Sequence, residues 1–489
     1  MFERLRGKLA VPAVILAMGI VEAYALRAGT LGIILIAVFC GMALVVVATG
    51  ANMSRIALGA AYACAFTLTW NGWFLGPVRP GDLLILITLM LLLVANPNAA
   101  FKTPPWWVKQ LAVAIILVAL ITIFIPPDPV YLAGRTVLGA TGKRIVDTTS
   151  SLPVANIGVA FKFVVAVFAT PMAFAGAALI DKHVARRLGI AFAAGAALSG
   201  LAATADRLGA NVSHFVTRVP SIAGGRQLGF TNHPNFLAAG TVLGIPFAFW
   251  LLASRKRREP LLGAVCMFGV LGGVYSSGSR GGAVCALLVL AVCFVLHPRT
   301  RGYTPTAALA GIFVVGVVAV LVPSVGHAIL VATRLSGGAA TQGSDTVRSL
   351  VGHQGIEDFK HSPLQGIGLQ ASFDASEVYL QELASGGLIL FTAMQIYMGG
   401  AIITAWRNFK RSDMSTALLG SLLAILVLNL FEADLTDRFY YVPAAILIAM
   451  VQTLDADDAA AKATAEADHE PDADQPTGPA PPHRQPART

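Results

Sequence analysis

The chain has 489 residues, of which 56% are hydrophobic and only 12% are charged, and its mean hydropathy is +0.71. Soluble globular domains carry about 25% charged residues, so this composition excludes a soluble globular enzyme and predicts a helical membrane protein. The net charge of +9 does not indicate nucleic-acid binding, because about half of the Lys and Arg residues lie in loops where membrane orientation and lipid headgroups explain them.

Apolar runs follow one another from Leu9 to Leu454, and each approaches the roughly 20 residues that cross a bilayer. The predicted spans are 9–26, 30–48, 54–70, 82–96, 108–126, 157–180, 188–204, 233–253, 260–275, 281–297, 305–322, 387–406, 414–431 and 439–454. We therefore expect an all-α polytopic membrane domain over residues 1–454, with about 14 transmembrane helices. A large ordered extracytoplasmic loop at 323–386 precedes the last three, and the Ala-, Asp- and Pro-rich residues 455–489 are expected to form a disordered cytoplasmic tail.

Basic residues are concentrated in alternate loops between the predicted spans. The densest cluster runs from Arg255 to Arg258, whereas the intervening short loops carry single basic residues such as Arg280 and Arg438. Because loops rich in Lys and Arg stay in the cytoplasm, this pattern predicts that both termini are cytoplasmic and that loop 323–386 is outside.

The five cysteines all lie inside predicted spans and show no CxxC spacing. They are therefore predicted to be small buried side chains rather than disulfide partners or zinc ligands. The outer loops contain no Asp-x-Asp pair that would indicate a metal site, so we expect no metal and no cofactor.

Three arginines stand in unusual settings on the predicted outer side. Arg226 follows two glycines just before a span, Arg280 lies in the tight turn Ser279-Arg280-Gly281, and Arg348 lies in the large loop. Guanidinium groups bind phosphate oxygens bidentately, and neighbouring glycines let backbone donors approach an anion. These arginines are predicted to bind a diphosphate at headgroup level; the alternative is that each is an interfacial anchor or the partner of a loop carboxylate.

Three segments in chain order resemble the motifs of the bacterial O-antigen ligase and O-antigen polymerase family. Residues 226–235 resemble its Arg…Gly-x-Phe-x-Asn-Pro-Asn stretch, and residues 279–281 resemble its Ser-Arg-Gly segment. Residues 348–387 resemble its Arg…His-Pro-Leu-x-Gly-x-Gly…His-Asn-x-Tyr-Leu…Gly pattern. The resemblance departs at the family's His-Asn pair, where this chain has Ser376 and Glu377.

The family's histidine assists the acceptor hydroxyl, so the resemblance requires another base in this chain. A carboxylate can act as a general base, which makes Glu377 and Asp374 the candidates. The alternative is a helix-capping box, because the segment from Asp374 to Glu377 also has that pattern. His353 and His361 lie in the same loop and are further candidates for the missing imidazole.

The resemblance implies an inverting, metal-independent glycosyltransferase in the inner membrane of a bacterium. The enzyme would move a glycan from a polyprenyl-diphosphate donor to the hydroxyl of a glycan, glycolipid or protein acceptor on the outer face. The expected catalytic residues are Glu377, Asp374 and Arg348, and the expected diphosphate-binding residues are Arg226, Arg280 and Arg348. Residues expected to line the site are His233, Asn235, His353, His361, Glu432 and Arg438. Two alternatives are a transporter or flippase of lipid-linked glycan, and an inactive family member that scaffolds envelope assembly.

Overall fold

The computed structural model describes residues 53–72, 79–96, 103–134, 136–138, 144–146, 153–217, 225–303, 339–370, 377–432 and 435–468. Among these residues, the only sheet is a short antiparallel hairpin of β1 (Thr136–Leu138) and β2 (Arg144–Val146). All other regular structure in the described part of the chain is helical, which confirms the all-α part of the predicted fold class.

The first half of the described chain contains α3 (Met53–Thr67), α4 (Pro80–Ala95), α6 (Trp106–Phe124), α7 (Pro129–Gly134), α8 (Pro153–Val164), the π-helical turn η1 (Val165–Ala169), α9 (Thr170–Ala178), α10 (Val184–Arg207) and the 3-10 turn η2 (Ser213–Phe215). The second half contains α11 (Pro234–Leu252), α12 (Glu259–Ser277), α13 (Arg280–Leu296), η3 (Arg301–Tyr303), α16 (Ala339–His361), α17 (Val378–Arg407), α18 (Ser415–Leu428), η5 (Arg438–Tyr441) and α19 (Val442–Asp468).

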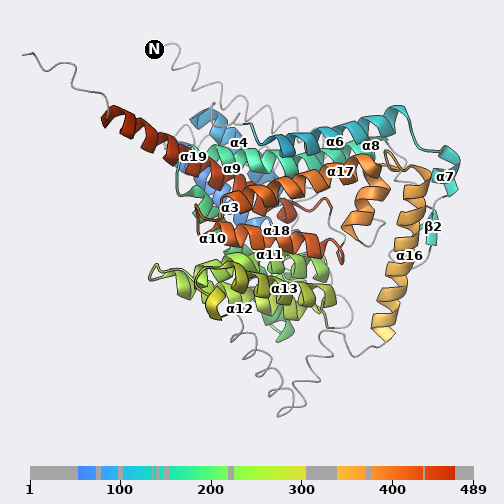
Figure 1. The fold of residues 1–489 in the computed structure, drawn as a ribbon. Helices are drawn as coiled ribbons and strands as arrows, with labels where there is room; N and C mark the ends of the chain where they lie inside the picture. Colours follow the sequence, from blue (N-terminus) through green and yellow to red (C-terminus); the bar gives the residue numbers. More distant parts are fainter. Residues whose placement is uncertain are drawn as a thin grey trace, which may run out of the picture.

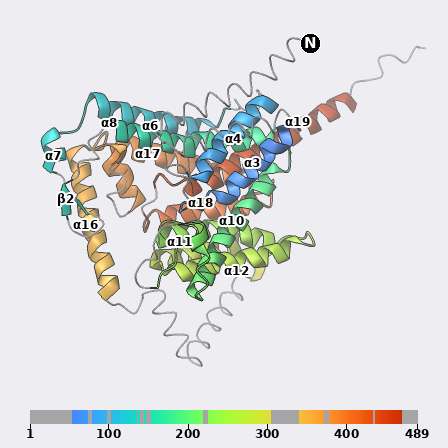
Figure 2. The same ribbon diagram turned by 180° about the vertical axis from the view of Figure 1, so that it is seen from behind.

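Most of these helices lie side by side along one direction and form a bundle (Figure 1). Helix α11 lies at its centre and packs against α10, α12, α13 and α18, while α17 packs against α6. Helices α3 and α4 cover the rear face (Figure 2). Sixteen residues of α11, from Pro234 to Leu251, are buried, as expected for a helix that is apolar on every side.

Seven helical segments among the described residues are long and apolar enough to cross a membrane: Trp106–Phe124, Asn156–Ala178, Val184–Arg207, Pro234–Leu252, Glu259–Ser277, Val378–Arg407 and Arg438–Thr464. Three shorter apolar helices are Pro80–Ala95, Arg280–Leu296 and Ser415–Leu428. The predicted spans 9–26, 30–48 and 305–322 lie outside the described residues, and each of the others coincides with a helix. The chain is therefore a multi-pass helical membrane protein.

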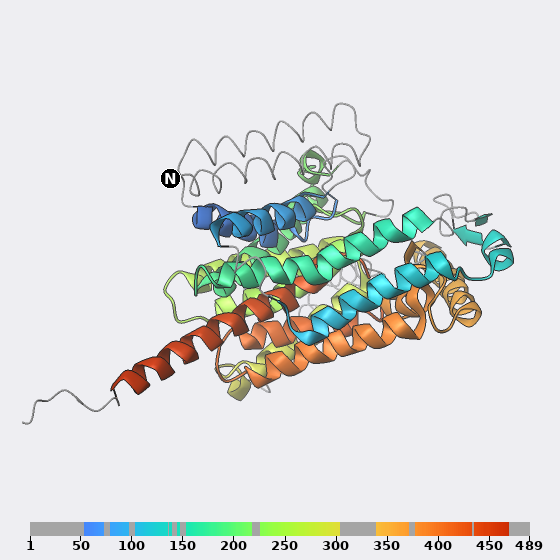
Figure 3. The same cartoon turned by 90° about the horizontal axis from the view of Figure 1, so that it is seen from above.

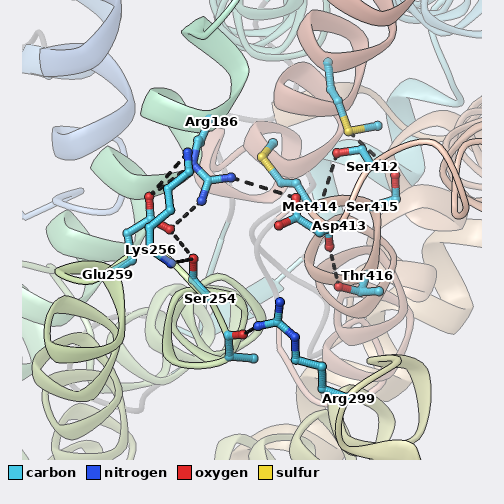
Figure 4. Close-up of polar contacts among 12 residues, drawn as sticks. Arg186, Ser254, Lys256, Glu259, Arg299, Ser412, Asp413, Met414, Ser415 and Thr416 are labelled. Atoms are coloured by element: carbon cyan, nitrogen blue, oxygen red, sulfur yellow. Dashed lines mark hydrogen bonds and ion pairs between the residues drawn. The ribbon is translucent and has the colours of Figure 1, made fainter.

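The bundle has two ends of different chemistry. At the end where α10, α12 and α18 begin, which we call the basic end, Arg186 links two helices (Figure 4). Its guanidinium pairs with Glu259 of α12, with Nε 3.2 Å from Oε1, and lies 4.6 Å from the ring centre of Trp250. Arg299 donates to the carbonyl of Ala253. This end contains the loops that the charge pattern assigns to the cytoplasm.

The opposite end, where α11, α13 and α17 begin, carries α16, which crosses the direction of the bundle (Figures 1 and 2). The segment after α16 pairs with a kink in α17: the Ile367 amide donates to the Ala384 carbonyl at 2.9 Å, and the Leu388 amide donates to the Pro363 carbonyl at 2.8 Å. The kink lies at Gly387, whose φ is 59° and ψ is −157°. Helix α17 therefore begins at Val378, ahead of the predicted span 387–406, and continues through this kink.

Helix α19 extends beyond the basic end to Asp468, whereas the sequence predicted disorder from Asp455 (Figure 3). Arg411 explains the added length, because it donates to Asp458 at 2.6 Å and to Asp455 at 3.3 Å. The alanine-rich composition suggested disorder, but alanine is also the best helix former, so α19 continues through these residues. Residues 469–489 of the predicted tail lie outside the described residues.

The Gly387→Ala variant should be clearly less stable than the wild type. The added Cβ would lie 2.4 Å from the carbonyl carbon of Leu364, at a positive φ that Ala rarely adopts. Such strain costs about 1–3 kcal/mol, and the thermal unfolding of detergent-solubilised protein would measure it. Gly399→Ala is the matched control on the same helix, because nothing lies within 4 Å of its Cβ position. Equal melting temperatures for the two variants would contradict this account of the kink.

Candidate functional site

The segment before α11 holds Arg226 between two helices. Its Nε donates to the carbonyl of Ser277 at the end of α12, at 2.8 Å, and its terminal nitrogen donates to the Asn235 side chain in the first turn of α11. The Gln227 amide also donates to the carbonyl of Ser276, at 3.0 Å. Both the backbone and the guanidinium are thus fixed, so Arg226 points to the start of α11.

His233 is the N-cap of α11. Its Nδ1 accepts a hydrogen bond from the Asn235 amide at 3.2 Å, which requires that nitrogen to be unprotonated. Burial, together with the positive charges of Arg226 and Arg348, lowers the pKa of His233 to about 4. The imidazole is therefore neutral at physiological pH, and in its capping role the proton is on Nε2.

The turn between α12 and α13 is built from Ser277-Gly278-Ser279. Gly278 ends α12 in the left-handed conformation, with φ 59°, and Ser279 is the N-cap of α13. The Ser279 hydroxyl accepts from the Gly282 amide at 3.2 Å and donates to Oε1 of Glu432 at 3.1 Å. Arg280, which is half-buried, begins α13 at the next position.

Glu432 connects these parts from the segment after α18. Its side chain is buried, accepts from Ser279, and is also hydrogen-bonded to the side chain of Asn235. Loss of hydration raises the pKa of this carboxyl to about 7, although the charges of Arg348 and Arg226 and the two hydrogen bonds oppose the rise. Arg226 and Arg348 therefore act on one carboxyl, at a point where α11 and α13 both begin.

This arrangement forms a cluster of positive groups around a single acidic side chain. Helix N-termini carry a partial positive charge and unpaired amides, and both attract anions. Two such N-termini and the guanidinium groups of Arg226 and Arg348 surround Glu432. The chemistry that fits this set of groups is the binding of a phosphorylated ligand.

A cleft of about 680 Å³ lies beside this cluster, between α16 and the start of α17. It is lined by Arg348, Ser349, Gly352, His353, Ile356, Glu377, Tyr379, Leu380, Leu383, Leu430 and Phe431. The lining is polar along part of α16 and at Glu377, and apolar along α17 and the segment after α18. The cleft is thus suited to a ligand with a charged head and an apolar chain.

Most of the predicted site residues are brought together. Arg226, His233, Asn235, Arg348 and Glu432 form the cluster, and Glu377 and His353 line the cleft with Arg348. Glu377 itself occupies the N-cap of α17 and makes no capping hydrogen bond, so the alternative that placed it in the first turn of a capping box is wrong. Asp374 and Ser376 lie outside the described residues.

Two predicted residues lie in other contacts. Arg438 donates to both oxygens of Asp82 at the start of α4, at 2.5 and 2.7 Å, and is only 6% exposed. His361 stacks on Tyr131 with ring centres 3.5 Å apart. It follows Arg348 by 13 positions in α16, or roughly 20 Å of helix. Neither residue lines the cleft.

The ion-pair partners that hold this end together could not be identified from the sequence. Asp437, next to Arg438, pairs with Arg79 and accepts a hydrogen bond from the side-chain nitrogen of Asn71 at 2.7 Å. Asp82 and Arg79 stand at the predicted outer end of one span, and Asp437 and Arg438 stand at the predicted outer end of another. This common position in the membrane was the one indication in the sequence that they could contact each other. Sequence offered no means of matching each base to its acid.

The Arg438–Asp82 pair should behave as a structural unit. Removing one partner of a buried ion pair leaves an uncompensated charge and costs about 3–5 kcal/mol. Arg438→Met and Asp82→Asn should each cause a large loss of stability in unfolding titrations with SDS, whereas the double variant should cost much less than their sum. Additive losses would show that the two side chains do not depend on each other.

Residues 263–393 match the family model described as O-antigen ligase. The matched segment runs from α12 into α17 and contains Ser279, Arg280, Arg348 and Glu377, whereas Arg226 precedes it. No curated protein matches the chain. The family match indicates a glycosyltransferase-type enzyme of polysaccharide biosynthesis. This match supports, over residues 263–393, the family that the motifs indicated.

Proposed function

We propose that the protein is an inverting, metal-independent glycosyltransferase that moves a glycan from polyprenyl diphosphate to an acceptor hydroxyl on the outer face of the bacterial inner membrane. One observation carries the proposal: Arg226 and Arg348 act on a single point between two helix N-termini, beside a cleft with polar and apolar walls. The basic end of the bundle would face the cytoplasm, which puts this cleft on the outer side.

The positive groups would stabilise the leaving group. When the bond from the sugar to the diphosphate breaks, negative charge develops on the phosphate oxygens, and fixed positive groups bind this charge more strongly than the ground state. Metal ions perform this task in many phosphate-transfer sites. In this proposal Arg226 and Arg348 perform it, with Arg280 beside them at the start of α13.

The cleft would separate the two parts of the donor. Leu380, Leu383 and Phe431 offer an apolar wall to the polyprenyl chain, while Arg348 and His353 on α16 lie on the polar side. Because the wall and the arginines meet at one end of the bundle, the chain could remain in the lipid while the diphosphate reaches the positive cluster.

Glu377 would act as the general base. It is exposed, lines the same cleft as Arg348, and stands in the sequence beside the position of the family's histidine. Its carboxylate would take the proton of the acceptor hydroxyl as that oxygen bonds to the anomeric carbon. The bond from this carbon to the diphosphate oxygen then breaks, and its electron pair leaves with polyprenyl diphosphate. Asp374 is the alternative base.

Replacing the arginines should abolish transfer without unfolding the protein. Loss of one donor that stabilises developing charge costs about 10²–10³-fold in rate, so Arg226→Ala and Arg348→Ala should release polyprenyl diphosphate that much more slowly. The assay uses purified protein, lipid-linked donor and acceptor, with EDTA present. Arg207→Ala is the control, because this half-buried arginine at the same end lies over Tyr275, 4.3 Å from its ring centre. Wild-type rates in both arginine variants would refute the proposal, as would complete inhibition by EDTA.

Glu377→Gln should lower kcat by about 10²–10⁴-fold while the KM for the donor changes little, because a general base contributes to the chemical step. Glu357→Gln is the matched control on α16, where Glu357 is exposed and pairs with Lys360 at 2.8 Å. Asp374→Asn tests the alternative base in the same assay. Full activity in the double variant Glu377→Gln/Asp374→Asn would exclude a carboxylate base in this segment.

A further inference from the structure

Glu432 is anchored at the border between the positive cluster and the cleft. It directly follows Leu430 and Phe431, which line the cleft, and its backbone carbonyl accepts from the Val378 amide at 3.0 Å. Its side chain is only 1% exposed. The carboxyl group is therefore held in a fixed position, out of water, next to the arginines that the proposed reaction uses.

The hydrogen bonds of Glu432 connect it to both helix N-termini. Ser279, the N-cap of α13, donates to Oε1 at 3.1 Å. The side-chain oxygen of Asn235 accepts a hydrogen bond from Arg226, which directs the side-chain nitrogen of Asn235 toward other acceptors. The side chain of Asn235 is also hydrogen-bonded to Glu432. Arg226, Asn235, Glu432 and Ser279 thus form one continuous chain of polar contacts.

We infer, on the basis of the proposed function, that Glu432 is a positioning residue and a proton-linked counter-ion: as a carboxylate it holds Arg226 and Arg348 in place, and it takes up a proton when the donor's diphosphate binds these arginines.

The charge balance of the cluster explains why a proton should be taken up. Arg226 and Arg348 repel each other and the two helix N-termini, so a buried anion among them lowers the energy of the site. A bound diphosphate diester adds two negative charges to the same small region. An ionised Glu432 would then repel the ligand at low dielectric, whereas the protonated acid keeps its hydrogen bonds to Ser279 and Asn235 without that repulsion.

Several other charged or titratable side chains stand on the elements around Glu432. They are Arg226, His233 at the start of α11, Arg280 and Cys285 of α13, Arg348 of α16, Glu377 and Glu382 of α17, and Asp437 and Arg438 on the following turn. Asp437 and Arg438 are paired with Arg79 and Asp82. His233, with its pKa lowered to about 4, is already neutral throughout the range near neutrality.

The direction of the pH dependence follows from these charges. The pKa of Glu432 is about 7 before binding, and the anionic ligand must raise it further. Below pH 7 the carboxyl is mostly protonated, so affinity is highest and nearly constant. As the pH rises above 7, binding requires the uptake of a proton, and affinity falls by up to about tenfold per pH unit until the pKa of the bound state is passed.

The test is isothermal calorimetry of the full-length protein with a geranyl-diphosphate-linked hexose, a diester with no group that titrates near neutrality. Titrations from pH 6 to 9, each in two buffers of different ionisation enthalpy, measure the protons taken up on binding. For the wild type we expect an uptake approaching one proton at pH 8 and little at pH 6. For Glu432→Gln, which keeps hydrogen-bonding capacity without the charge, we expect no uptake and an affinity independent of pH.

Two further variants make the result decisive. Ser279→Ala removes a donor to the ionised carboxyl, so the fall in affinity should begin at higher pH, and this variant serves if Glu432→Gln is unstable. Glu357→Gln, far from the cluster in the exposed part of α16, should match the wild type. Binding without proton uptake in the wild type, or unchanged uptake in Glu432→Gln, would overturn the inference and leave the proposed function standing. Absence of binding at every pH would overturn both.

Discussion

Positive charge concentrated around a buried carboxyl is the constraint on which this end of the molecule depends. Arg226 and Arg348 lie where α11 and α13 present their positive N-termini, and such an arrangement is stable only with a negative charge among its members. Glu432 provides that charge from a third element, and Ser279 and Asn235 fix its orientation. The segment after α18 is thereby tied to two other helices, so the site and the packing of this end are one structure.

The backbone that carries the cluster is defined by a few positions where the chain turns sharply. Gly278 ends α12 so that Ser279 can cap α13, and His233 caps α11 with its own ring nitrogen. Gly387 lets the first turns of α17 leave the line of the bundle and form one wall of the cleft. Because each turn sets the direction of one helix start, the relative positions of the arginines follow from backbone conformation as much as from side-chain contacts.

The sequence predicts the helices well because lipid allows few alternatives: an apolar run of sufficient length must satisfy its own backbone hydrogen bonds. The two arginines of the positive cluster could also be found in the sequence, since Arg226 follows two glycines and Arg348 stands at the start of a segment that resembles a family motif. The pairing of basic with acidic residues could not be predicted from the sequence. Arg438 was assigned to the site together with Glu432. Its ion-pair partner is instead Asp82, on a helix hundreds of positions earlier. The capping-box alternative for 374–377 was wrong, because Glu377 has an extended backbone and α17 begins only at Val378.

Four of the described arginines fall into two groups according to their partners. Arg186 pairs with Glu259 and Arg438 pairs with Asp82, in direct ion pairs that link helices of the bundle. Arg226 and Arg348 instead act on a carboxyl whose pKa of about 7 allows it to lose its charge under physiological conditions. A guanidinium with a permanent ionic partner is committed to the fold, whereas one whose partner can be neutralised by a proton is available to an incoming anion. The sequence shows only arginines and acids; the burial of Glu432 separates the two groups, and it is the reason why we propose that this cluster binds and releases a phosphorylated ligand.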